Sequence, residues 1–252
     1  MIKASGNLVD ENFALRQELQ ALKIEQQMTW SMLVDVVRKL QASSASIKAA
    51  VSSLLSYDIF WDATNQHEFL QTIDASANQT SDLVMLLSLA SRLKAERLET
   101  KPEPHSLQEI LTNVESNIIR RFPDKQLILS MTHEGQVVWV DYDYLSLALV
   151  LFLEVLLSNP IQSQLAISAH EIEDGWKLEI IGTDPAIIQY MQTFRRVSDQ
   201  PYDKKEEKFS SDILLKLLVV MKLMDFQNME IQLPSSPEFN IPVAILIPGR
   251  YR

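Results

Sequence analysis

The sequence contains no cysteine and only five glycines among its 252 residues. Without cysteine, the chain cannot form disulfides, use a thiolate as a nucleophile or bind a metal through sulfur. Glycine-rich phosphate loops need several glycines within a few residues, because the backbone must approach the phosphate oxygens closely. Here the glycines lie far apart, at Gly6, Gly135, Gly175, Gly182 and Gly249. The sequence therefore excludes P-loop enzymes and enzymes with a dinucleotide-binding fingerprint.

Positive charge and long apolar runs are also scarce. There are 23 lysines and arginines against 33 aspartates and glutamates, which gives a formal net charge of −10. An acidic surface repels nucleic-acid phosphates, so we predict no nucleic-acid partner. No apolar run reaches the roughly 18–20 residues that cross a bilayer, and the N-terminus lacks the apolar core of a signal peptide. We therefore expect no membrane span in this chain and a cytoplasmic location.

The N-terminal part of the sequence has the pattern of a long helix. No proline occurs between Leu8 and Leu55, and apolar residues recur in steps of three and four. These seam positions are Leu15, Leu19, Leu22, Leu33, Val36 and Leu40. Gln26 and Thr29 form two polar layers within the seam. The pattern favours a helix in a parallel coiled coil, and a single helix packed on its own domain is the alternative.

A second helical pattern runs from Gln66 to Leu98, after a short connection. Its apolar stripe consists of Leu70, Ile73, Ala77, Val84, Leu87 and Ala90. Two long helices joined by a short connection form a helical hairpin, and such a hairpin pairs with a second copy to make a four-helix bundle. We therefore predict a homodimer, with an interface made of the seam and of the stripe from Leu70 to Leu87.

The prolines in Lys101–Pro104 end the helical pattern and predict a domain boundary, with one domain at 1–100 and a second at 101–252. In the second domain, the periodicity predicts helices at 106–121, 142–158, 187–194 and 211–224, and strands at 127–131, 137–140, 165–172, 176–181, 229–233 and 243–247. A turn is expected at 133–135 and a charged loop at 198–208. The expected fold is of the α+β class: the coiled coil and hairpin are followed by an α/β sandwich of one mixed sheet and a helical layer.

Three local strings, in this order of elements, resemble the catalytic core of sensor histidine kinases. Residues 86–99 read Leu-Leu-Ser-Leu-Ala-Ser-Arg-Leu-Lys-Ala-Glu-Arg-Leu-Glu, 106–111 read Ser-Leu-Gln-Glu-Ile-Leu, and 140–145 read Val-Asp-Tyr-Asp-Tyr-Leu. The resemblance covers roughly Val34 to Pro248. It implies a dimerisation and phosphotransfer hairpin followed by an ATP-binding domain of the GHKL type.

The phosphoacceptor motif that the resemblance implies is missing. Aligned on Ser46-Ile47-Lys48, Arg38 takes the place of the family's histidine, Lys39 that of its acidic base and Ser43 that of its proline. A guanidinium stays protonated and has no lone pair to accept a phosphoryl group. The four histidines, His67, His105, His133 and His170, all lie outside the first helix.

The nucleotide-binding motifs are also replaced. Leu151 and Val155 occupy the two asparagine positions that hold Mg²⁺ in the family, with Glu154 between them. Gly182 stands where the family has the aspartate that recognises adenine, and Asp184 and Ala186 stand where it has glycines. The last glycine-rich box becomes Phe209-Ser210-Ser211-Asp212-Ile213. We therefore predict no catalytic residue, no cofactor and no metal site.

Several charged residues have both a structural and a functional interpretation. Arg38 is either a docking group for an acidic receiver domain or a solvated arginine beside Asp35. Asp141 and Asp143 suit the N-terminus of a helix better than a carboxylate pair, and Asp184 is a turn residue. The mixed run at 203–208 is typical of a solvated loop.

These inferences identify the chain as a histidine-kinase-like pseudokinase, a dimeric signalling module that acts through protein contacts. The expected partners are a response regulator receiver domain or an active histidine kinase. One alternative is a divergent active kinase or phosphotransferase with an unorthodox acceptor. Another is a ligand sensor, in which Trp176, Phe209 and the apolar helix at 149–157 line a remodelled nucleotide pocket.

Overall fold

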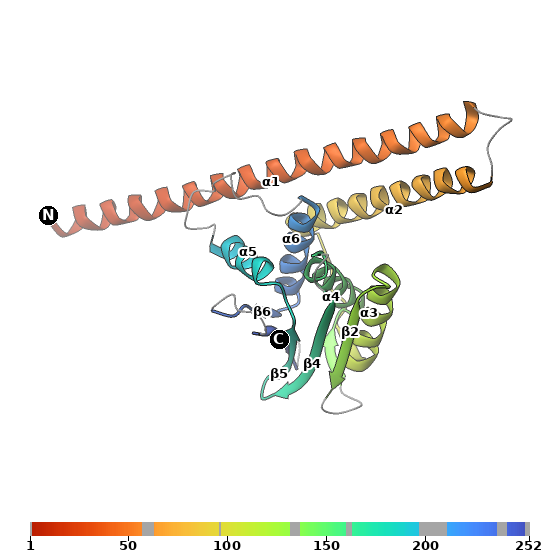
Figure 1. Ribbon diagram of the computed structural model, residues 1–252. Helices are drawn as coiled ribbons and strands as arrows, with labels where there is room; N and C mark the ends of the chain where they lie inside the picture. Colours follow the sequence, from red (N-terminus) through yellow and green to blue (C-terminus); the bar gives the residue numbers. More distant parts are fainter. Residues whose placement is uncertain are drawn as a thin grey trace. The chain divides into compact units, whose positions relative to one another are not determined.

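The computed structural model describes residues 2–56, 63–95, 97–131, 137–159, 163–196, 211–235 and 241–249. The chain divides into two compact units, 1–91 with 198–215 and 92–197 with 216–252 (Figure 1). The turn expected at 133–135 and the loop expected at 198–208 lie outside the described residues.

The first unit is built on a helical hairpin. Helix α1 spans Ile2–Ser56 and helix α2 spans Ala63–Lys94, and the two run antiparallel (Figure 1). Val36, Ser43 and Ala50, which are seven residues apart, are buried on α1. Ser43 donates a hydrogen bond of 2.9 Å from its Oγ to Oε1 of Gln79 on α2. The hairpin predicted from the periodicity is therefore present, with a partly buried polar contact between its two helices.

The second unit has a five-stranded mixed sheet in the order β2-β4-β5-β7-β6. Its strands are β2 (Gln126–Met131), β4 (Gln164–Ile172), β5 (Gly175–Ile181), β6 (Glu230–Gln232) and β7 (Val243–Pro248). Strands β2 and β4 are parallel, and the other pairs are antiparallel. The helices are α3 (Leu107–Arg121), α4 (Tyr142–Leu156), α5 (Pro185–Arg196) and α6 (Ser211–Phe226), of which α6 enters the unit at Lys216.

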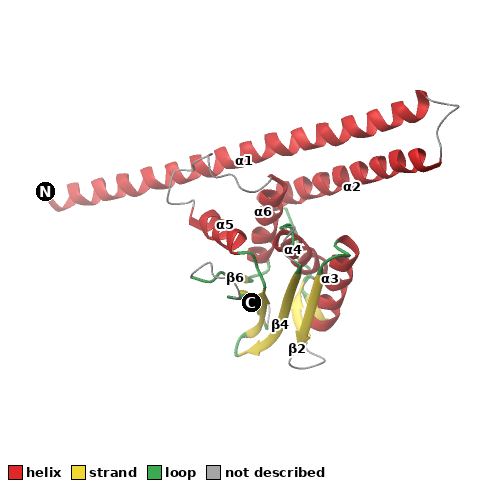
Figure 2. Cartoon of the chain, in the orientation of Figure 1, coloured by secondary structure: helices red, strands yellow, loops and turns green. Residues whose placement is uncertain are grey.

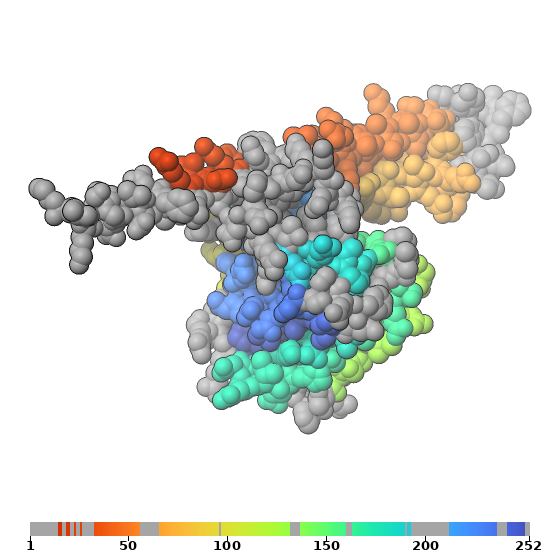
Figure 3. Space-filling model, turned by 60° about the vertical axis from the view of Figure 1, so that its left-hand side comes forward, coloured from red at the N-terminus to blue at the C-terminus, as the bar shows by residue number. Residues whose placement is uncertain are grey.

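The helices form a layer on one face of the sheet (Figure 2). Alternate residues of the strands are buried on that face, including Leu165, Ile167, Leu178, Ile180 and Ile245. On the opposite face Ser168, Lys177 and Glu179 are half-buried, and β4 and β5 form part of the visible surface (Figure 3). The alternation follows from the two-residue period of strands, so the sandwich predicted from the sequence is confirmed.

The structure corrects the sequence analysis at one strand and in one pairing. Residues Glu103–Ser106 form β1, which pairs antiparallel with β3 (Val137–Val140) in a separate two-stranded sheet. The sequence analysis expected a breaker at Lys101–Pro104 and placed Ser106 in the following helix. Proline is tolerated there because an edge strand does not need every amide proton for pairing. Strand β2 pairs with β4 and not with β3, although β2 and β3 are neighbours in the sequence.

Helix α4 is the central helix of the second unit. Eleven of its 15 residues are buried. Asp141 is its N-cap, and its carboxylate accepts a hydrogen bond of 3.2 Å from the backbone amide of Tyr144. Asp143 lies in the first turn. The interpretation of these two carboxylates as helix-start residues is therefore confirmed. Within the described ranges, no helix is both long and apolar enough to cross a membrane.

Candidate functional site

The two positions implied to hold Mg²⁺ lie in the hydrophobic core of the second unit. On α4, Leu151 is 2% exposed and Val155 is fully buried. Both side chains are hydrocarbons, whereas Mg²⁺ requires oxygen ligands in near-octahedral geometry. Phe152, between them, is also fully buried. The residues at these positions therefore do not fit a magnesium–nucleotide complex.

Glu154, the one acidic residue of this segment, is held by two cations from other helices. Its side chain is 2% exposed. One carboxylate oxygen pairs with Nη1 of Arg121, the last residue of α3, and the other lies 2.6 Å from Nζ of Lys216 on α6. Isolated burial of a carboxylate is strongly unfavourable, and these charge-assisted hydrogen bonds offset that cost. Both oxygens of Glu154 are thus engaged by the chain itself.

The sequence analysis did not identify Arg121 and Lys216. The available signal was Glu154 itself, because a charge in a helix that is otherwise apolar needs a partner. Which residues supply that partner depends on how α3 and α6 pack beside α4, which a single sequence does not reveal. The cluster has one carboxylate and two cations, so its formal charge is +1.

The loop after β5 is stabilised by its own side chains. Gly182, in the place of the family's aspartate, has a φ of 96°, which glycine adopts without strain. Asp184 accepts a hydrogen bond of 2.8 Å from the backbone amide of Ala186 and another from the side-chain amide of Asn159. This is an Asx-type turn that leads into α5, as predicted for Asp184. No side chain at Gly182 can accept a hydrogen bond from an adenine amino group.

On the first unit, the phosphoacceptor position is a solvated arginine. The Arg38 side chain is 75% exposed, and its Nη1 lies 3.2 Å from Oδ1 of Asp35, one helical turn away. Lys39 pairs with Asp212, the second residue of α6. Ser43, in the place of the family's proline, keeps the helix continuous and bonds Gln79. None of these three side chains can accept and pass on a phosphoryl group as a histidine does.

An apolar groove of about 380 Å³ lies beside Arg38 on α1. Leu33, Val34, Val37, Arg38 and Gln41 line it. Val34 and Val37 are each about half exposed, although valine favours burial. The groove is therefore an apolar surface next to an exposed cation.

The predicted dimer-interface residues are distributed over both helices of the hairpin. Leu15, Leu19, Leu70, Ala77 and Val84 are exposed; Leu33, Leu40, Ile73 and Leu87 are half-buried; Val36 is buried; and the side chain of Leu22 lies outside the described residues. Leu70, Ala77 and Val84 are seven residues apart and form an exposed stripe on α2. Such a stripe leaves apolar surface in water unless another helix covers it.

Three of the four histidines lie beside a side chain of the same unit, and of the two aromatic residues of the predicted ligand pocket only Trp176 is described. The His105 ring packs on Tyr142 with centroids 5.2 Å apart, and His170 lies 3.1 Å from the Ser168 hydroxyl. His67 lies 3.0 Å from Gln71, one turn along α2. His133 and Phe209 lie outside the described residues. Trp176, on β5, is 5% exposed. Across the described part of the chain, no cluster of three or more histidine, cysteine, aspartate or glutamate side chains is placed to hold a metal.

Comparison with solved structures agrees with this architecture. The Acinetobacter baumannii histidine kinase AdeS superposes with a TM-score of 0.57 at 14% identity, over 83% of this chain and 96% of that chain. Full-length ShkA in complex with AMPPNP superposes with a TM-score of 0.56 at 14% identity, over 90% of this chain and 46% of that one. No protein-family model and no curated protein matches the sequence. The chain therefore has the fold of a sensor histidine kinase catalytic core, as the resemblance predicted.

Proposed function

We propose that this chain is a catalytically inactive, histidine-kinase-like signalling module that works as a homodimer through protein contacts. The observation that carries the proposal is the state of α4. Leu151 and Val155 are buried where the fold's active members hold a metal, and Arg121 and Lys216 neutralise Glu154 between them. Phosphoryl transfer depends almost entirely on metal ions and preorganised donors that stabilise the transferring group. This segment offers side chains for neither.

The direct test is a calorimetric titration of the full chain with ATP and with a non-hydrolysable analogue, each with and without Mg²⁺. We expect no binding heat at nucleotide concentrations of about 1 mM, because the buried Leu151 and Val155 provide no ligand for a magnesium–nucleotide complex. Magnesium-dependent binding in the micromolar range would instead support the divergent active kinase. Nucleotide binding of equal affinity with and without Mg²⁺ would support a nucleotide sensor.

A second test addresses the phosphoacceptor position. Arg38→His places an imidazole on an exposed turn of α1, where the side chain of Arg38 is 75% exposed. We expect no phosphohistidine when this variant is incubated with radiolabelled ATP and Mg²⁺, because an acceptor without a nucleotide site has no donor. Acid-labile label on the variant and none on the parent would contradict the proposal.

The dimer is supported by the apolar side chains that one copy leaves in water. Exposed large apolar residues occur on both helices of the hairpin: Val34, Val37, Val51, Leu55, Leu70, Val84 and Met85. A second hairpin would cover them in a four-helix bundle with two-fold symmetry, in which each copy offers the same surface. Leu15 and Leu19, exposed further along α1, would pair in the coiled coil. The domain limits 1–100 and 101–252 are part of this proposal.

The output of the module would be contact with a response regulator receiver domain or with an active histidine kinase. Arg38 and the groove at Leu33, Val34 and Val37 support this, because an exposed cation beside an apolar groove suits an acidic surface with an apolar anchor. Titration of a receiver domain into the chain and into Arg38→Ala tests the assignment. A receiver domain that binds both equally would remove Arg38 from the contact.

A further inference from the structure

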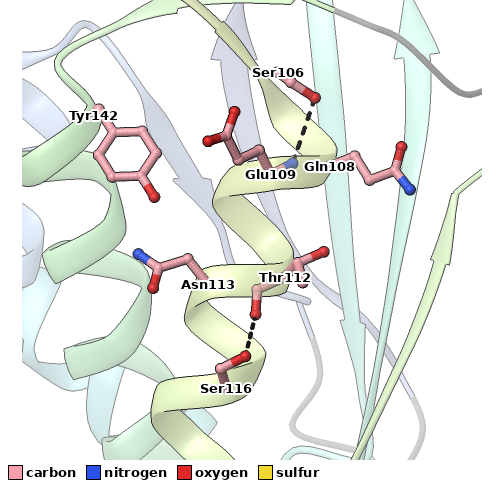
Figure 4. A pocket seen from close by; sticks show the side chains of 7 residues that line it. All are labelled: Ser106, Gln108, Glu109, Thr112, Asn113, Ser116 and Tyr142. Carbon is pink, nitrogen blue, oxygen red and sulfur yellow. Dashed lines mark hydrogen bonds between the residues drawn. The ribbon is translucent and has the colours of Figure 1, made fainter.

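A polar groove of about 530 Å³ runs along the solvent-facing side of α3 in the second unit. Its lining consists of Ser106, Gln108, Glu109, Thr112, Asn113, Ser116 and Tyr142. Figure 4 shows Glu109 and Asn113 extending from α3 toward the ring of Tyr142, which belongs to the first turn of α4. The groove contains none of the residues of the α4 cluster discussed above. It is therefore a separate surface, independent of whether the chain binds a nucleotide.

The residues on this face of α3 are unusual for an exposed helix. Thr112, Asn113 and Ser116 lie in the middle of the helix, where alanine, lysine or glutamate would be more favourable. The Ser116 hydroxyl donates 2.9 Å to the backbone carbonyl of Thr112, a local bond that competes with helical structure (Figure 4). Packing does not dictate residue choice on an exposed face. A run of weak helix formers there departs from local preference, and such departures concentrate at functional sites.

The groove is suited to a cation. Glu109 is the one charged side chain in its lining, and among the described residues no lysine, arginine or histidine lies within ion-pair distance of that carboxylate. The Tyr142 ring stands across from it, and aromatic faces attract guanidinium groups. The Asn113 side-chain oxygen accepts a hydrogen bond of 3.2 Å from the Asn117 amide, and the Ser106 hydroxyl accepts one of 3.4 Å from the backbone amide of Glu109. With an overall charge of −10, the chain also attracts cationic partners over longer distances.

An exposed apolar ledge adjoins the groove. Ser106 lines the groove and is paired with Val137 in the two-stranded sheet, and the next residues on the same face are Pro104 and Trp139. Val137 is 52% exposed and Trp139 is 44% exposed. Exposed tryptophan next to a polar groove is typical of a protein-binding surface, because aromatic residues are enriched in the centres of interfaces.

We propose that the α3 groove binds an arginine side chain from a segment of a partner protein, with the guanidinium between the Glu109 carboxylate and the Tyr142 ring and an apolar neighbour on the Val137–Trp139 ledge. Arginine suits the groove better than lysine, because its planar fork can donate two parallel hydrogen bonds to the Glu109 carboxylate while it stacks on the phenol ring.

The experiment is a calorimetric titration of the full chain with the acetylated, amidated tetrapeptide Leu-Ala-Arg-Ala. The comparison peptide has citrulline in place of arginine, which keeps the shape and removes the charge. We expect the arginine peptide to bind at least tenfold more tightly than the citrulline peptide. Glu109→Gln should lower the affinity for the arginine peptide at least tenfold. Glu173→Gln, which removes the same charge from the exposed β4–β5 turn, should change that affinity less than twofold.

The Val137–Trp139 ledge is tested separately, with a second peptide that lacks the apolar leucine. Trp139→Ala should lower the affinity for Leu-Ala-Arg-Ala severalfold and leave the affinity for Ala-Ala-Arg-Ala unchanged. The proposal is overturned if the arginine peptide does not bind, if citrulline binds as well, or if Glu109→Gln and Glu173→Gln have equal effects. Maltose is titrated at the same concentrations. If it binds more tightly than the arginine peptide, the proposal is overturned and the groove is assigned to a carbohydrate. Circular dichroism of each variant checks that the fold is intact.

Discussion

Glu154 is a buried carboxylate shared between two cations, and the three residues should behave as one unit. Lys216→Met should lower the free energy of unfolding by about 1–2 kcal/mol, because one charge-assisted hydrogen bond is lost. Arg121→Met should cost less, about 1 kcal/mol, since the arginine side chain is 40% exposed and solvent screens its pairing. Urea denaturation of each variant measures these differences.

Combining the substitutions tests whether the two cations matter mainly because they compensate the buried charge of Glu154. Removing both cations should cost about 3–5 kcal/mol, because Glu154 would then be a buried charge without a partner. Adding Glu154→Leu to that double variant should restore most of the loss, since a fully apolar replacement leaves no charge to compensate. A triple variant as unstable as the double would contradict this account.

Leu151 tests whether the nucleotide site can be regained at a single position. Leu151→Asn should lower the free energy of unfolding by about 3 kcal/mol, because it removes a buried leucine and buries an amide without a partner. It should produce no affinity for magnesium and ATP. Leu151→Met, which nearly keeps the volume, should cost less than about 1.5 kcal/mol. Thermal unfolding and the ATP titration together provide the measurement, and an asparagine variant that is stable and binds Mg-ATP would contradict the proposed loss of function.

At the scale of elements, α3 combines a well-packed inner face with an outer face of weak helix formers. Thr112→Ala with Ser116→Ala should raise the free energy of unfolding by about 1 kcal/mol, because alanine favours the helix more than either residue. Gln108→Ala, also on the outer face, should have little effect, since glutamine is already a good helix former. Thermal melts followed by circular dichroism measure both. A double variant of lower stability would show that these hydroxyls support the fold rather than a binding surface.

The elements that the sequence predicted are those with local signals. The hairpin, α3 and α4 follow from apolar spacing and from the caps at Ser106 and Asp141, which need only neighbouring residues. Strand β1 was missed because Pro104 reads locally as a breaker, and only its pairing with β3 makes it a strand. The parallel pairing of β2 with β4 and the partners of Glu154 depend on contacts between distant segments, which no local pattern encodes.

At the scale of the whole molecule, the filled candidate catalytic positions of the second unit contrast with the exposed apolar surface of the hairpin. In the second unit, the candidate catalytic positions are filled: Leu151 and Val155 lie in the core, and the oxygens of Glu154 and Asp184 are bonded to the same chain. In the first unit, apolar side chains stand in water along both helices. Stabilising interactions that are missing from one copy can come from association. The exposed apolar surface of the hairpin supports the proposed contact with other proteins.

The exposed stripe of Leu70, Ala77 and Val84 provides the sharpest test of that organisation. Leu70→Glu with Val84→Glu should convert a dimer into a monomer at micromolar concentration, because two charges per copy would be buried against the partner helix. The fold of each copy should persist, since both side chains are more than half exposed when the chain is alone. Gln71→Glu with Asn78→Glu is the matched control: it adds the same charge one residue along α2 from Leu70 and Ala77, at exposed polar side chains outside the apolar surface. Light scattering coupled to size exclusion gives the mass of each variant. A wild-type chain that runs as a monomer would overturn the proposed dimer. A stripe variant that stays dimeric while the control dissociates would place the dimer interface on a different face of the hairpin.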